Sequence, residues 1–155
     1  MDVIDLLEKM PILFQNVFVE IVPQSDPDVS KVPGTVIPKN GDYIIKIRES
    51  IYDGAYYRCI GGYRMHIMHE ICHVLLFMLG HQPKYDRAFK NESLNPYESI
   101  EWQAKALAGE FLIPYEETKG ISVKQIMEVC KVSKQAAQFR VNLDLNNKEE
   151  KQYEK

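Results

Sequence analysis

A chain of 155 residues is long enough for one compact core, and its 45% hydrophobic and 26% charged residues are typical of a folded globular domain. A formal net charge of −3 supplies no overall field that would attract phosphate backbones or anionic lipids, which disfavours nucleic-acid and membrane binding. Three widely spaced cysteines, an acidic N-terminus unlike a signal peptide and apolar runs shorter than a membrane span favour a cytoplasmic protein.

Residues 1–62 have the pattern of a short helix followed by a small sheet. Apolar spacing predicts a helix over residues 2–10 that ends at Pro11. Apolar and β-branched runs then predict short strands at residues 17–22, 35–37, 43–48 and 55–60. Asn40-Gly41 between the second and third of these is typical of a hairpin turn.

Helical patterns dominate the rest of the chain. A long helix is predicted over residues 63–79, where Gly80 ends it, and a second over about 97–112, with Asn95 as its cap. Ser122 with Gln125 forms a capping-box pattern for a third helix, and Ser133 is a candidate cap for a fourth. The charged tail, residues 146–155, is expected to fray.

Together these elements predict an α+β fold with a helical C-terminal half. We expect a single domain over residues 1–145, made of a helix and sheet part (1–62), two metal-binding helices (63–114) and a helical cap (119–145). The short N-terminal helix and the sheet should pack on the long helix of residues 63–79. The active site should lie where the two halves meet.

The long helix carries a metal-binding pattern, H-E-x-x-H, at His69, Glu70 and His73. Histidines four apart share one helix face and can reach one ion, whereas Glu70 lies on the flank of that face. There it could take a proton from the attacking water and return it to the leaving amine, while zinc polarises the scissile carbonyl. With four histidines in the chain, a chance match is a weak alternative.

The surroundings of the motif favour the same interpretation. Two histidines and a carboxylate in a buried helix without partners would destabilise the fold by several kcal/mol, and a bound metal offsets that cost. The apolar residues that indicate a buried helix are Ile67, Met68, Ile71, Cys72, Leu75, Leu76 and Leu79.

Three further residues near the motif have different expected roles. Cys72 lies well away from the midline of the ligand face and should pack as a small apolar residue. His66 does share that face, so it could be an alternative ligand, although we favour a supporting group or a substrate contact. His81 follows Gly80 and is expected in a loop.

A catalytic zinc ion takes three protein ligands, so one more should come from the second long helix. Glu98 and Glu101 are three apart and share a face of that helix. Spacing alone does not choose between them.

The pattern from residue 63 to residue 114 resembles the ImmA/IrrE-type metallopeptidase family. In that family H-E-x-x-H is followed about thirty residues later by E-x-x-A-N-x-F-A-x-x-L-L-M-P. The corresponding positions here are Glu101, Ala104, Lys105, Leu107, Ala108, Phe111, Leu112, Ile113 and Pro114. The resemblance implies a zincin-like fold, one zinc ion per chain and Glu101 as the third ligand.

Lys105 departs from the family motif, which has asparagine at this position. A cation cannot accept the N–H of a ligand histidine. Either another carboxylate or a backbone carbonyl orients the histidine, or Lys105 turns away and pairs with Glu101 in the metal-free protein.

Residues 119–145 also resemble a helix-turn-helix, which raises the question of DNA binding. Residues 119–144 contain five basic and two acidic residues, a modest surplus for a phosphate-binding surface. We therefore prefer a helical cap that contacts a substrate protein. Its apolar residues available for packing are Ile126, Val129, Val132, Ala136, Phe139 and Val141.

Two functions follow as hypotheses. The first is a zinc endopeptidase that, as the family resemblance implies, cleaves or inactivates a repressor of a phage or other mobile element. The second is a non-enzymatic, zinc-containing regulator that binds a repressor or DNA through its C-terminal helices. Glu70 favours the enzyme, because a structural zinc site needs no base beside an open ligand position.

Overall fold

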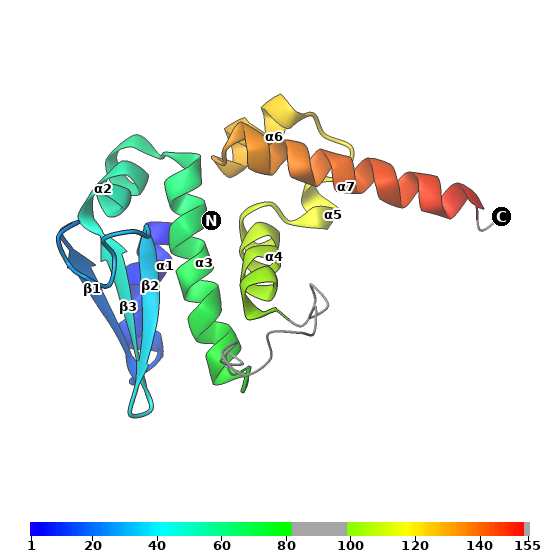
Figure 1. Ribbon diagram of the computed structural model, residues 1–155. Coiled ribbons are helices and arrows are strands. Elements are labelled where there is room, and N and C mark those ends of the chain that lie inside the picture. Colours follow the sequence, from blue (N-terminus) through cyan, green and yellow to red (C-terminus); the bar gives the residue numbers. More distant parts are fainter. Residues whose placement is uncertain (82–98, 154–155) are drawn as a thin grey trace.

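The computed structural model describes residues 1–81 and 99–153, with side chains described as far as residue 143. Figure 1 shows the sheet on one side of the long central helix α3 and helix α4 on the other. The fold is α+β, as expected. In chain order the elements are α1 (Val3–Leu13), β1 (Val17–Val22), β2 (Gly34–Lys39), β3 (Asp42–Arg48), α2 (Glu49–Arg58), α3 (Gly61–Met78), α4 (Ile100–Leu112), α5 (Tyr115–Thr118), α6 (Val123–Cys130) and α7 (Lys134–Tyr153).

The described sheet has three strands in the order β1-β3-β2, so β2 lies at an edge. β1 runs parallel to β3, and β2 runs antiparallel to it. The hairpin predicted at Asn40-Gly41 is confirmed. Both residues have positive φ, 53° and 91°, which is the backbone that a two-residue turn between twisted strands requires.

The strand predicted at residues 55–60 is wrong, because residues 55–58 belong to helix α2 and residues 59–60 form the turn between α2 and α3. Ile51 and Ala55, four apart, lie buried on one face of the helix. Tyr56 and Tyr57, residues of a type that is common in strands, are 53% and 75% exposed here and contribute little to the core. The helix ends at Cys59, whose left-handed backbone (φ 48°) closes the last turn.

Pro11 does not end the first helix, which continues to Leu13. Because Pro11 lies in the last turn, its missing N–H removes only one hydrogen bond near the helix end. The N–H of Phe14 still donates to the carbonyl of Met10 at 2.9 Å.

The ends of the later helices follow the sequence in part. Gly80 ends α3 with φ 84°, and Ser122 and Gln125 form the expected capping box. Ser133 accepts from the N–H of Ala136 at 3.2 Å, as predicted. The described part of α4 begins at Ile100, and the predicted cap Asn95 lies outside the described residues.

The C-terminal helix differs from expectation. The tail was predicted to fray from residue 146, but α7 continues to Tyr153. Lysine, glutamate and glutamine are strong helix formers, which explains the extension. The short helix α5 was not predicted, since four residues carry no detectable periodicity.

Helix α3 lies at the centre of the core and is covered by α1, α2, α4 and the sheet. Ile67, Met68, Ile71 and Cys72 are fully buried, so Cys72 packs as the small apolar residue expected. Arg64 of α3 donates to the carbonyls of Met1 at 2.8 Å and of Lys131 at 3.2 Å. These bonds tie the turn between α6 and α7 to the core.

Two adjacent glycines at the start of α3 should respond oppositely to alanine. A Cβ on Gly61 would lie 2.4 Å from backbone atoms of Val132 and Ser133, whereas one on Gly62 meets nothing within 4 Å. Gly61→Ala should therefore lower the free energy of unfolding by about 1–3 kcal/mol. Gly62→Ala should raise it by about 0.5–1 kcal/mol, because alanine favours the helix. Urea denaturation measures both, and equal shifts would contradict the described contact.

Candidate metal centre

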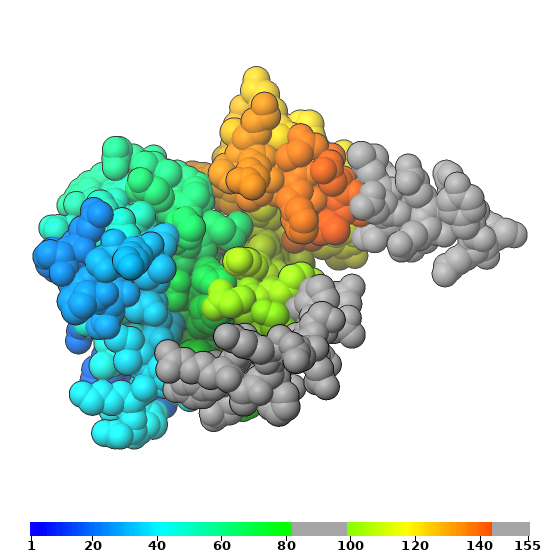
Figure 2. Space-filling model, viewed as in Figure 1, coloured from blue at the N-terminus to red at the C-terminus, as the bar shows by residue number. Residues whose placement is uncertain are grey.

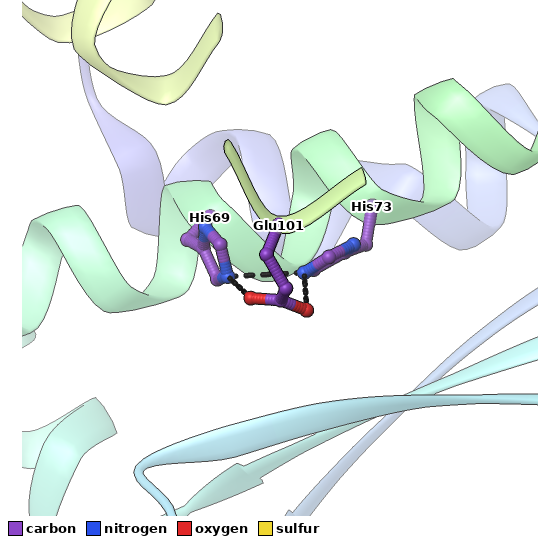
Figure 3. A group of neighbouring side chains, drawn as sticks. All are labelled: His69, His73 and Glu101. Carbon is purple, nitrogen blue, oxygen red and sulfur yellow. Dashed lines mark hydrogen bonds and ion pairs between the residues drawn. The ribbon is translucent and has the colours of Figure 1, made fainter. Parts of the chain in front are cut away.

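His69, Glu101 and His73 point toward one another from two neighbouring helices (Figure 3). The two histidines lie one turn apart on α3, and Glu101 lies in the first turn of α4. The Nε2 atoms of the histidines are 3.0 Å apart. The carboxylate of Glu101 reaches both, with Oε2 at 3.3 Å from Nε2 of His69 and Oε1 at 3.2 Å from Nε2 of His73.

These three separations fit a tetrahedral ion. Zinc ligands at about 2.0–2.1 Å lie roughly 3.3 Å from one another when the geometry is tetrahedral. The candidate ligand atoms of His69, His73 and Glu101 all lie within 4.8 Å of one another. Two imidazole nitrogens and one carboxylate form a donor set suited to zinc that leaves a fourth position for a non-protein ligand.

The environment keeps the two histidines neutral. Burial lowers the pKa of His69 to about 4, with a further contribution from the neighbouring His73. Burial also lowers the pKa of His73, while the Glu101 carboxylate acts in the opposite direction on both rings. A neutral imidazole has a free lone pair, which is the form that binds a metal.

The second ring nitrogen of each histidine, Nδ1, is not held by a hydrogen bond from the described residues. Nδ1 of His69 and Nδ1 of His73 are buried, and neither has a hydrogen-bond partner among the described residues. Neither of the two arrangements expected around Lys105 is found among residues 1–81 and 99–143: no carbonyl or carboxylate of these residues accepts from the Nδ1 atoms, and no ion pair joins Lys105 to Glu101. Lys105 instead lies close enough for its charge to lower the pKa of both histidines.

Glu70 lies beside this group without belonging to it. Its side chain is only 8% exposed, and it packs against β2 where Gly34 leaves room. A Cβ on Gly34 would lie 3.2 Å from Cγ of Glu70 and 2.7 Å from Cδ1 of Ile47. Burial, together with the charge of Glu101, raises the pKa of Glu70 to about 7.

This raised pKa predicts a pH dependence for the metal-free protein. The folded state holds the Glu70 proton more tightly than the unfolded chain, so ionising Glu70 destabilises the fold as pH rises from about 4.5 to about 7. Glu70→Gln cannot ionise and should gain stability relative to wild type across that range, by on the order of 3 kcal/mol. Denaturation of both chelator-treated proteins at several pH values measures the difference. A difference that stays constant with pH would show that Glu70 is not perturbed.

A cavity of about 560 Å³ lies over the metal group and opens between the sheet side and α4. Figure 2 shows the face of the molecule on which the strands, α3 and α4 meet. His66 lines the cavity and is exposed, outside the ligand group, which agrees with its expected placement on the ligand face. His81 follows α3 and is exposed, and Glu98 lies outside the described residues.

One wall of the cavity was not predicted from the sequence. Residues 32–36, from the end of a loop and the start of β2, line the cavity opposite the helices. This segment ends more than sixty residues before α4 begins at Ile100, and it carries no charged group that would mark it as part of a site. Only the fold brings it there.

The H-E-x-x-H helix, the neighbouring glutamate and the cavity above them are features of the metallopeptidase class. The chain belongs to the IrrE N-terminal-like domain family, a family of metal-dependent peptidases, whose model matches residues 61–142. The matched segment runs from the start of α3 into α7, which confirms the resemblance. No curated protein and no solved structure matches the chain significantly. Among the described helices, none is long and apolar enough to cross a bilayer.

Proposed function

We propose that the chain is a zinc-dependent endopeptidase that cleaves, and thereby inactivates, a transcriptional repressor of a phage or other mobile element. The observation that carries the proposal is the convergence of His69, His73 and Glu101 beside the buried Glu70. Zinc would be held by the two Nε2 atoms and the Glu101 carboxylate, one ion per chain. When bound, zinc acts as a Lewis acid that makes water nucleophilic near neutral pH.

Glu70 would act as the general base and then as the general acid. Its carboxylate is placed in the same cavity, where it accepts a proton from the attacking water at an Oε atom. The same atom then returns that proton to the nitrogen of the departing amine. A pKa raised by burial makes Glu70 a stronger base than an exposed glutamate, which suits proton exchange near pH 7.

The cavity walls support a peptide as substrate. β2 is an edge strand of the described sheet, and its first residues line the cavity. An extended peptide lying there would run beside backbone N–H and C=O groups that can pair with it. Apolar side chains such as Val36 and Phe77 supply contact surface on either side.

A repressor encoded beside this chain in its genome is the substrate to test, because the family resemblance motivates that partner. The purified, zinc-loaded protein should convert the repressor into two fragments that mass spectrometry assigns to one cut, and a chelator should stop the reaction. Loss of DNA binding by the repressor without any fragment would instead favour the non-enzymatic regulator. If the repressor stayed intact and still bound its operator, it would not be a substrate.

A further inference from the structure

The cavity is lined by a lysine, Lys105, that forms no ion pair with any residue that the structure describes. Lys105 lies one turn after Glu101 on the same face of α4, lines the cavity and is exposed. Glu101 is engaged with both histidines, and no carboxylate of the described residues lies within ion-pair distance of the Lys105 ammonium. The described chain therefore leaves this charge unpaired.

A charge balance indicates what the cavity attracts. A bound divalent ion is matched by the carboxylates of Glu70 and Glu101, so the charge of Lys105 is left over. A cation beside a metal also opposes metal binding, which is a disadvantage with no benefit to the fold. The surplus charge lies in a cavity whose other walls include Val36, Met65 and Ile100, where charge interactions are screened less than in bulk water.

We propose that Lys105 is a specificity residue that binds a carboxylate of the substrate, presented near the scissile bond as an acidic side chain or as a free C-terminus. The proposal rests on the proposed peptidase function. A lysine suits this role because its three donors form charge-assisted bonds to a carboxylate at the end of a flexible stem. The asparagine of the family motif has no charge, so this preference would distinguish the chain from relatives that keep asparagine.

The test measures binding without hydrolysis, in the zinc-loaded Glu70→Gln background. The probes are fluorescein-labelled degenerate peptides of one length: an amidated set with central glutamate, an amidated set with central glutamine, and the glutamine set with a free C-terminus. Fluorescence anisotropy should show the glutamate or the free-carboxylate set binding about fivefold tighter than the neutral set. The set that binds more tightly than the neutral set identifies whether the carboxylate comes from a side chain or from the C-terminus.

Matched variants assign the preference to Lys105. Lys105→Gln should abolish it, Lys105→Arg should keep it, and Lys124→Gln, an exposed lysine on α6, should leave it unchanged. Zinc content is measured in each variant, because removing a nearby cation alters metal affinity. The preference should also weaken at high salt.

Three outcomes overturn the proposal. All three peptide sets could bind equally tightly, which would show that the cavity does not select a carboxylate. The acidic preference could persist in Lys105→Gln, which would assign it to the metal. Alternatively, Lys105→Gln in the active protein could reduce kcat equally for all peptides with no change in preference, which would place Lys105 at the reacting carbonyl. An acidic preference lost in Lys105→Gln, in a protein that hydrolyses none of the peptides, would support Lys105 and contradict the peptidase.

Discussion

Replacing Glu70 by glutamine is expected to abolish peptide hydrolysis while the fold and the metal site remain. Glutamine has nearly the same shape, so it should fill the space that Gly34 leaves for Glu70. It cannot accept a proton from water, however, and general-base catalysis contributes about 10²–10⁴-fold to such reactions. Single-turnover cleavage of the repressor, followed by gel or mass spectrometry, measures the loss.

The control for this variant is Glu116→Gln, an exposed glutamate on α5 that should retain wild-type turnover. Glu70→Gln should also hold its partner, because binding continues without cleavage. Intact repressor should therefore co-purify with Glu70→Gln and not with wild type. Equal turnover in both proteins would remove Glu70 from the mechanism.

Much of the metal centre could be predicted because its pattern is local. His69, Glu70 and His73 lie within five residues on a helix whose apolar character is plain, so their relative placement follows from helix geometry alone. The hairpin and the serine caps were predictable for the same reason. Where a local signal was ambiguous, as with the tyrosines of α2, packing decided and the prediction was wrong.

The rest of the site depends on contacts between distant segments. Spacing in the helix predicted over residues 97–112 left two glutamates open as the third ligand, and the family resemblance was needed to choose Glu101. The wall formed by residues 32–36 has no signal in the sequence. The sequence also could not show that the two Nδ1 atoms have no hydrogen-bond partner among the described residues, because the motif shows that asparagine is absent without showing what replaces it.

The metal ligands themselves give the second large expected effect. Purified wild-type protein should contain about one zinc ion per chain, and a His69→Ala, His73→Ala double variant should contain none, because two of three ligands are lost. Glu101→Ala should weaken zinc binding by more than the roughly 10–100-fold that changes outside the ligand set cost. Elemental analysis after dialysis gives the stoichiometry, and competition with a chromophoric chelator gives the affinity.

His66→Ala is the matched control, since His66 lines the same cavity outside the ligand group and its loss should leave zinc in place. Glu98→Ala should also weaken binding less than Glu101→Ala. The opposite order would indicate that Glu98, one turn earlier along the chain, is the third ligand. If the double histidine variant kept stoichiometric zinc, the metal would be bound elsewhere. The chemistry assigned to Glu70 would then have no metal beside it.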